Sequence, residues 1–304
     1  MISICLTRFI NETKDPWSQV IMKGFLKALK KHKKIYNVEE IFGYPQKKYD
    51  LIILVGIRSI VKRNLDKDKI LPYCKKLIDM GDSSMDPRRN EEDIYFYFSP
   101  FNRKLHKHYE YLPKFVLEEH LYPSQEKDKL NVYVDHYKAQ SEDEREVSIN
   151  TINKIFEDIR NSKVPINVFY HTSKGIEKNR LYPEIPNKGV PQSAAYIPFE
   201  TIAEYYRKTD IFLPTHRETQ GMLAQEIGAC GGITVLQEWM YPSLTHYQFP
   251  NVIYKKDQTI DFLFLKNILK NHSKTDLRNH VLKYCSFNNF ENKLNNTIRS
   301  MFNI

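Results

Sequence analysis

Short apolar runs alternate with amphipathic segments along most of this chain. Uninterrupted apolar runs are typical of parallel strands covered on both faces, and apolar residues three or four positions apart are typical of helices. The clearest run is YDLIILVG at residues 49–56. We predict further strands at residues 2–6, 75–80, 94–98, 130–134, 166–170, 194–197, 211–213, 233–236 and 251–254.

Helices are predicted between many of these strands. The first begins at Asp15 and Pro16, an N-cap followed by proline at the first helical position, and its apolar stripe extends to Leu29. Ser286 is placed to cap a last helix whose apolar residues recur every three or four positions. Further helices are expected at residues 57–62, after the acidic run 142–144, and at 201–208, 222–230 and 260–269.

This alternation indicates an α/β protein with two Rossmann-like domains. The chain has 304 residues, which exceeds the usual size of one domain. Residues 99–128 are irregular and contain three prolines, so we place the boundary there. The predicted domains are 1–126 and 127–285, followed by a final helical segment, 286–304.

Residues 210–237, DIFLPTHRETQGMLAQEIGACGGITVLQ, form one strand–loop–helix–strand unit whose loop carries the chemistry. Glu218 precedes the helix and Glu226 lies within it, eight positions apart, with Gly221 where the helix begins. Free N–H groups and the helix dipole favour an anion at such a terminus, and glycine allows it to approach the backbone. A diphosphate fits there, with one carboxylate toward a sugar and the other toward a ribose.

This segment resembles the E-x7-E region of retaining glycosyltransferases of the GT-B class, especially the GT4-like group, whose usual pattern is close to E-G-F-G-L-x-x-x-E-A-x-A-C-G. Thr219 replaces the first glycine of that pattern and Gln220 its aromatic residue. The matching positions are Glu218, Gly221, Met222, Glu226, Ala229, Cys230 and Gly231. Over the first 126 residues the resemblance rests only on the alternation of strands and helices.

The resemblance implies that residues 1–126 are the acceptor side, that 127–285 bind the nucleotide-sugar donor, and that the last helix crosses back to the first domain. Glu218 would orient the sugar hydroxyls and stabilise developing positive charge, and Glu226 would hold the ribose. The donor-binding residues that the resemblance implies are Lys138, Phe199, Arg217, Gly221, Met222, Leu223 and Glu226.

For two of these residues, the sequence also allows another interpretation. The arginine that relatives carry directly after the strand at 130–134 is absent, so Lys138 is the nearest substitute for neutralising the diphosphate. Arg145 is a poorer one because it falls inside the predicted helix, and Arg217 could share the role. Phe199 stands where relatives hold the nucleotide base, but core packing explains it equally well.

The first domain offers one candidate near the transferred sugar. Asp82 follows the predicted strand at 75–80, and Asp79 is the second choice; a turn or helix-cap role explains Asp82 as well. No protein nucleophile is evident, so we expect front-face retention without a metal or other cofactor. Asp66 and Asp68 form a D-x-D sequence, but no strand precedes it, which argues against a metal–nucleotide site.

The formal net charge of +9 is larger in residues 1–126 (+6) than in 127–304 (+3). Such a surface attracts nucleic acid, anionic lipid or phosphorylated donors. Two acceptors stay open: a glycan or lipid-linked sugar, and a hydroxymethylated base in DNA, which the basic first half of the chain permits. No apolar run reaches the roughly 18 residues of a membrane span, and Arg8 interrupts the first apolar stretch, so we expect a cytoplasmic protein.

The four cysteines have no metal-type spacing and are expected to be reduced structural thiols. Two other functional classes stay open. One is a non-catalytic sugar- or nucleic-acid-binding module on a GT-B fold, because the loop and the arginine position depart from the family pattern. The other is a GT-B phosphorylase or epimerase.

Overall fold

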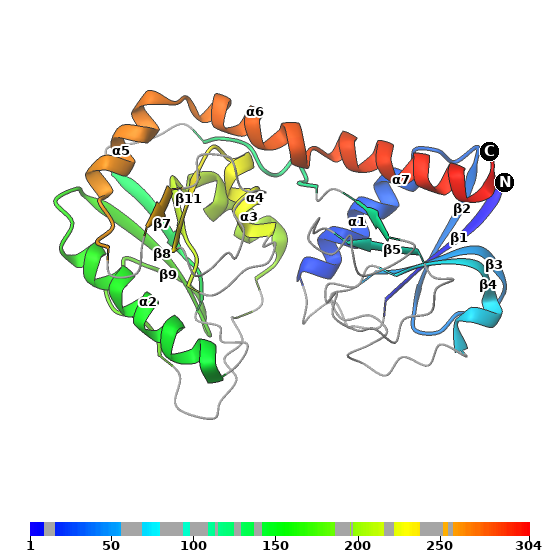
Figure 1. Ribbon diagram of the computed structural model, residues 1–304, viewed down its shortest axis with the longest axis horizontal. Coiled ribbons are helices and arrows are strands. Elements are labelled where there is room, and N and C mark those ends of the chain that lie inside the picture. The colour runs from blue at the N-terminus through cyan, green and yellow to red at the C-terminus, as the bar shows by residue number, and fades with distance from the viewer. Residues whose placement is uncertain are drawn as a thin grey trace. The chain divides into compact units, whose positions relative to one another are not determined.

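The computed structural model describes residues 1–8, 16–55, 69–79, 94–97, 109–112, 115–124, 129–136, 142–185, 195, 197–215, 222–237, 252–254 and 258–304. These residues form two compact units (Figure 1). The first unit is Met1–Leu117 together with Cys285–Ile304, and the second is Glu118–Tyr284.

The first unit contains a parallel sheet in the order β2-β1-β3-β4-β5-β6. Its strands are β1 (Ile2–Arg8), β2 (Tyr36–Phe42), β3 (Tyr49–Leu54), β4 (Cys74–Asp79), β5 (Ile94–Tyr97) and β6 (Tyr109–Tyr111), with the short 3-10 helix η3 (Leu71–Tyr73) before β4. The central strands β1 and β3 pair Ile4 with Leu51 and are almost wholly buried, as their continuous apolar runs predict.

Two helices of the first unit, α1 (Pro16–Lys30) and α7 (Phe287–Phe302), pack through a cluster of phenylalanines. The ring centroids of Phe25 and Phe290 lie 5.0 Å apart, and those of Phe115 and Phe290 lie 4.3 Å apart. Ser286 caps α7 as predicted, because its side chain accepts a hydrogen bond from the N–H of Asn289. The C-terminal helix therefore belongs to the same unit as the N-terminal sheet.

The second unit contains a sheet in the order β12-β11-β10-β7-β8-β9, parallel except for β9. Its strands are β7 (Leu130–Val134), β8 (Ile166–Thr172), β9 (Gly175–Lys178), β10 (Ile211–Leu213), β11 (Ile233–Gln237) and β12 (Val252–Tyr254). Its helices are α2 (Glu142–Arg160), α3 (Phe199–Lys208), α4 (Met222–Ala229), α5 (Phe262–Asn271) and α6 (Lys274–Cys285).

Helices cover both faces of this second sheet. Val132, Val134 and Tyr170 point to the face where α2 and α5 supply apolar residues to one core. The alternate strand residues point to the other face, where Tyr133 meets Tyr206 of α3. Because successive side chains of a strand point to opposite faces, β7 and β8 present apolar residues on one face of the sheet and polar side chains on the other.

The predicted fold class is confirmed, and the elements differ from the predictions in a few places. The structure adds β2, β6, β9 and α6, which the sequence patterns did not indicate. The strand expected at 194–197 is absent at its two described positions, Ala195 and Ile197. The antiparallel strand β9 occupies the edge of β8 that such a strand would need. The helix expected at 57–62 lies outside the described residues.

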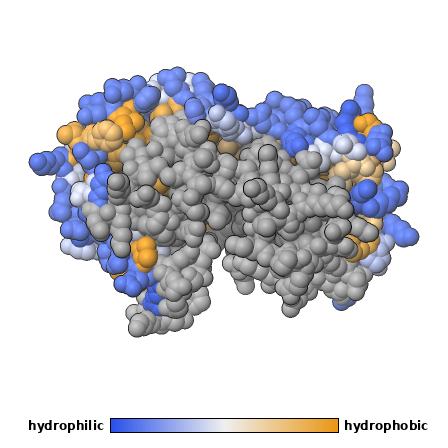
Figure 2. Space-filling model, viewed as in Figure 1, coloured by the Kyte–Doolittle hydropathy of each residue, from blue (hydrophilic) through white to orange (hydrophobic). Residues whose placement is uncertain are grey.

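The described surface of the second unit includes an apolar area over α5 (Figure 2), to which Leu263 and Phe264 contribute with exposed fractions of 56% and 52%. Within the described parts of the chain, none of the helices combines the length and the apolar character that crossing a bilayer requires.

Candidate functional site

The candidate site lies at the carboxyl ends of β7, β8 and β10 in the second unit. The chain passes from β7 to β8 on one side and later to β10 on the other, so the winding direction reverses between β7 and β10. Open parallel sheets bind ligands at such a switch point, beyond the carboxyl ends of the strands. The N–H of Asp135 donates to the carbonyl of Leu213 at 3.1 Å, and the Thr215 hydroxyl donates to the carbonyl of His136 at 2.6 Å. These bonds hold together the two segments that leave β7 and β10.

Asp135 and His136 follow β7 directly and contact each other closely. Oδ1 of Asp135 accepts a hydrogen bond from the backbone N–H of His136 at 2.8 Å and lies 2.9 Å from Nδ1 of the same histidine. The Asp135 side chain is 7% exposed and that of His136 is 22% exposed. The pair therefore combines a buried carboxylate with an imidazole that solvent reaches.

His171 joins this pair from the neighbouring strand. Val134 pairs with Tyr170, so Asp135 and His171 follow at adjacent positions of the two strands. Nε2 of His171 lies 3.1 Å from the carbonyl oxygen of Ala195, which can only accept, so Nε2 carries the hydrogen. Its Nδ1 accepts a hydrogen bond from the Tyr133 hydroxyl at 3.2 Å. Burial lowers the pKa of His171, which favours this neutral form.

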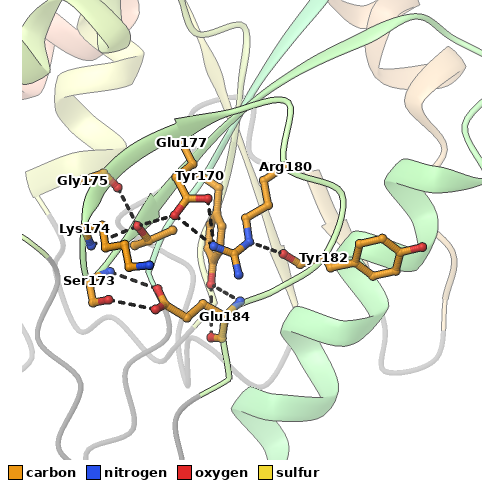
Figure 3. Close-up of polar contacts among 9 residues, drawn as sticks. Tyr170, Ser173, Lys174, Gly175, Glu177, Arg180, Tyr182 and Glu184 are labelled. Carbon is orange, nitrogen blue, oxygen red and sulfur yellow. Dashed lines mark hydrogen bonds and ion pairs between the residues drawn. The ribbon is translucent and has the colours of Figure 1, made fainter.

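The β8–β9 hairpin and the segment that follows it hold the residues on both sides of His171 (Figure 3). The Tyr170 hydroxyl accepts from the N–H of Glu184 at 3.1 Å, and the Glu184 carboxylate accepts from the N–H and hydroxyl of Ser173 at 3.1 and 2.8 Å. Arg180 donates to Glu177 at 2.8 Å and lies over the Tyr170 ring. The imidazole of His171 therefore projects from a braced strand end and not from a loose loop.

Two buried tyrosines connect these strand ends to the helices. The rings of Tyr133 and Tyr206 lie 5.5 Å apart. Burial raises the pKa of both hydroxyls, and the negative charges of Asp135 and Glu226 raise them further. Both hydroxyls therefore remain protonated hydrogen-bond donors near neutral pH.

Helix α4 carries three of the predicted donor-binding residues. Met222 is buried at its first position, Leu223 is half-buried, and Glu226 is only 7% exposed. Burying a carboxylate costs free energy unless the group has partners, and Glu226 has interactions within the chain that offset this cost. Burial, with a contribution from Glu226, raises the pKa of the Cys230 thiol to about 12, which makes it an unreactive thiol.

Phe199, the remaining described donor-binding candidate, is the first residue of α3 and is buried. Its ring meets His120 edge to face, with centroids 5.6 Å apart. Asp79 is the last residue of β4. The other predicted site residues lie outside the described residues, and they are Asp82, Lys138, Arg217, Glu218 and Gly221.

The prediction gave no role to Asp135, His136 or His171. The sequence does hold a signal for them, because each follows or ends a buried strand at the edge where ligands bind in parallel sheets. Asp135 and His136 occupy the positions directly after β7, where the resemblance implied a basic residue.

Comparisons with known proteins address the fold. No protein-family model matches the chain, and no curated protein matches its sequence. The solved structures include the lipopolysaccharide outer core galactosyltransferase WaaB in its apo form, with a TM-score of 0.57 and 11% identity over 97% of this chain and all of that one. The glycosyltransferase AviGT4, involved in avilamycin A biosynthesis, gives a TM-score of 0.56 and 9% identity over 98% and 97% of the two chains. The chain has the GT-B fold.

A third solved structure has the same fold and another named activity. It is a candidate UDP-N-acetylglucosamine 2-epimerase from Listeria monocytogenes, with a TM-score of 0.56 and 10% identity over 99% of this chain and 96% of that one. At such identities the likeness establishes the fold alone, and the activity has to be argued from the site.

Proposed function

We propose that this protein transfers a sugar from a nucleotide-diphosphate sugar to a hydroxyl acceptor with retention of the anomeric configuration, as GT4-like enzymes do. The observation that carries the proposal is the buried Glu226 of α4, the helix that follows β10 in the chain, and β10 borders the switch point of the second sheet. A carboxylate held there suits the paired hydroxyls of a ribose, because an ionised carboxylate accepts two hydrogen bonds at once.

The rest of the E-x7-E-like segment gives the proposal its chemistry. Helix α4 begins at Met222, directly after Gly221 in the sequence, and the N–H groups of a helix start can hold the diphosphate. Lys138 and Arg217 are the proposed cationic contacts. Glu218 orients the sugar, and the departing phosphate accepts the proton of the acceptor hydroxyl. Electrostatic stabilisation of a leaving group is worth about 3 to 4 kcal/mol per donor.

The proposed acceptor is a glycan or lipid-linked sugar, or a hydroxymethylated base in DNA. The net charge of +9 supports a polyanionic acceptor as the second case. Electrostatic binding to DNA falls steeply with salt because binding releases condensed counterions. Transfer to DNA should therefore weaken between 50 and 200 mM salt, by roughly 10³-fold or more if six or more phosphates are contacted. Transfer to a neutral glycan should change little.

The first test is a thermal-shift screen against UDP, GDP, ADP, CMP and their sugars. We expect one nucleotide to raise the unfolding midpoint, because a ligand that binds only the folded state stabilises it. Glu226→Gln should lower the affinity for that nucleotide by about 10- to 100-fold, because hydrogen bonds to a charged group are worth about 1.5 to 3 kcal/mol. Glu204→Gln is the matched control, since Glu204 is exposed on α3 and should leave affinity unchanged.

Turnover separates the proposal from its alternatives. With a donor and an acceptor panel, the wild-type protein should form a product whose anomeric configuration, read by NMR, matches that of the donor. Glu218→Ala should lower the rate by about 10²- to 10³-fold without changing the circular dichroism spectrum. Nucleotide binding with no turnover on any acceptor would indicate a binding module. An isomerised donor formed without acceptor would indicate an epimerase.

A further inference from the structure

Three side chains at the carboxyl ends of β7 and β8 form a potential metal-binding group. Asp135, His136 and His171 each offer one ligand atom, and these atoms all lie within 4.8 Å of one another. Atoms that bind one ion at about 2.1 Å lie roughly 3 to 4 Å apart, so small side-chain rotations bring the three into range. The braced end of β8 and the backbone bonds after β7 keep their main chains in place.

The composition of the group favours some ions over others. Two imidazoles and one carboxylate are a ligand set for zinc and for other divalent transition metals, whereas magnesium and calcium prefer oxygen ligands alone. Three protein ligands also leave at least one coordination position for water or a bound ligand. Asp135 and His171 are both buried, and the more accessible His136 gives the ion a path from solvent.

One contact already orients His171 as a ligand. Histidines that bind metals commonly donate their second ring N–H to a carbonyl or carboxylate, which fixes the tautomer and the ring direction. Nε2 of His171 does this toward the carbonyl of Ala195, so Nδ1 presents its lone pair. Nδ1 accepts the hydroxyl of Tyr133 in this structure, and an ion would replace that hydrogen bond. Tyr133 is therefore a competitor of the metal and not one of its ligands.

We propose that Asp135, His136 and His171 bind a divalent transition-metal ion of the zinc type. The family resemblance predicted a reaction without a metal, and this ligand set is the reason to infer that an ion binds nevertheless. The inference concerns the binding of the ion and does not depend on the identity of the substrate.

The test measures metal binding directly on the full chain. The protein is stripped with a chelator, equilibrated with Zn²⁺ or Co²⁺, and assayed for bound metal by mass spectrometry and for the visible absorption of protein-bound Co²⁺. We expect about one ion per chain, no competition by Mg²⁺, and affinity that is lower by about tenfold or more in Asp135→Asn and His171→Ala. Tyr133→Phe should bind at least as tightly as the wild type, because it removes the competing hydrogen bond.

Two controls make each result decisive. His272→Ala removes an exposed histidine at the end of α5 and should leave binding unchanged, which separates this group from adventitious binding by surface histidines. Asp135→Asn is nearly isosteric, so it keeps the test valid if His171→Ala does not fold. Absence of stoichiometric Zn²⁺ would overturn the proposal. The proposal would also be overturned if Asp135→Asn bound the ion with wild-type affinity and an unchanged Co²⁺ spectrum. That result would assign the ion to other residues, such as the cysteines.

Discussion

Replacing Gly24 by alanine has two opposite effects on the stability of the protein, one from helix propensity and one from packing. The balance of the two predicts whether the free energy of unfolding rises or falls. Gly24 lies in α1, where alanine is favoured over glycine by about 1 kcal/mol. A Cβ atom at this position would fall on the ring of Phe115, closer than van der Waals contact allows. Propensity alone therefore predicts a more stable protein, and packing predicts a less stable one.

The surroundings of Phe115 decide the magnitude. The ring is fully buried and lies 4.3 Å from the ring of Phe290 and 5.8 Å from that of Phe287, measured between centroids. It has little room to move away from a new methyl group. Overpacking a core costs about 1 to 3 kcal/mol, and we expect the upper end of that range here. After subtracting the gain in propensity, Gly24→Ala should destabilise the first unit by about 2 kcal/mol.

The assay must report on the first unit alone, since a chain of two units need not unfold in one step. The chain has two tryptophans, Trp17 in α1 and Trp239 in the second unit. In a Trp239→Phe background, urea unfolding followed by fluorescence reports on Trp17. The free energy of unfolding is then compared between the parent and Gly24→Ala, with the same dependence on urea concentration used for both proteins.

Two further variants check the reasoning. In a Phe115→Leu background the ring is gone, so Gly24→Ala should become neutral or stabilising. Lys23→Gly, at the exposed neighbouring position, should cost about 1 kcal/mol and so calibrates propensity in this helix. A stabilising effect of Gly24→Ala while Phe115 is present would refute the packing argument.

Two other predictions concern carboxylates. Asp158 of α2 accepts hydrogen bonds from Lys154 Nζ at 2.7 Å and from the N–H of Ile260 at 2.9 Å. Asp158→Ala should therefore destabilise the second unit by about 2 to 4 kcal/mol and speed hydrogen exchange at Ile260. Hydrogen bonds from Lys75 and from the backbone N–H and hydroxyl of Ser3 on β1 lower the pKa of Asp50 to about 2, below its unfolded value near 4. The stability that Asp50 contributes is therefore present above pH 4 and lost as the pH falls to 2, and Asp50→Asn should be less stable than the wild type at pH 6 but not at pH 2.

These two predictions have separate controls. Glu157→Ala, at an exposed position beside Asp158, should change unfolding and exchange by less than about 0.5 kcal/mol. Asp276→Asn removes an exposed carboxylate of the second unit. It should not change how the stability of the first unit falls between pH 6 and pH 2. A constant difference between Asp50→Asn and the wild type from pH 6 to pH 2 would contradict the assigned coupling.

Two of the elements that the sequence patterns missed, β9 and α6, share a physical cause. β9, with the sequence GIEK, has no apolar pattern, and it exists as a strand because its backbone pairs with β8. α6 is weakly amphipathic, and Arg278 ties it to the carbonyls of Ala229 and Leu121. Long-range hydrogen bonds of this kind leave no trace in local periodicity.

The sequence by itself determined the α/β class, the central strands and the cap of the last helix, because burial on both faces and helical periodicity depend only on the order of residue types. It also put Glu226 in a helix directly after a strand and loop. Only the tertiary structure decided the strand order, and with it the meeting of Asp135 and His171, which are 36 positions apart in the chain. That meeting depends on the pairing of β7 with β8 and on the carbonyl of Ala195, and such choices are made by the packing of whole elements and not by any local pattern.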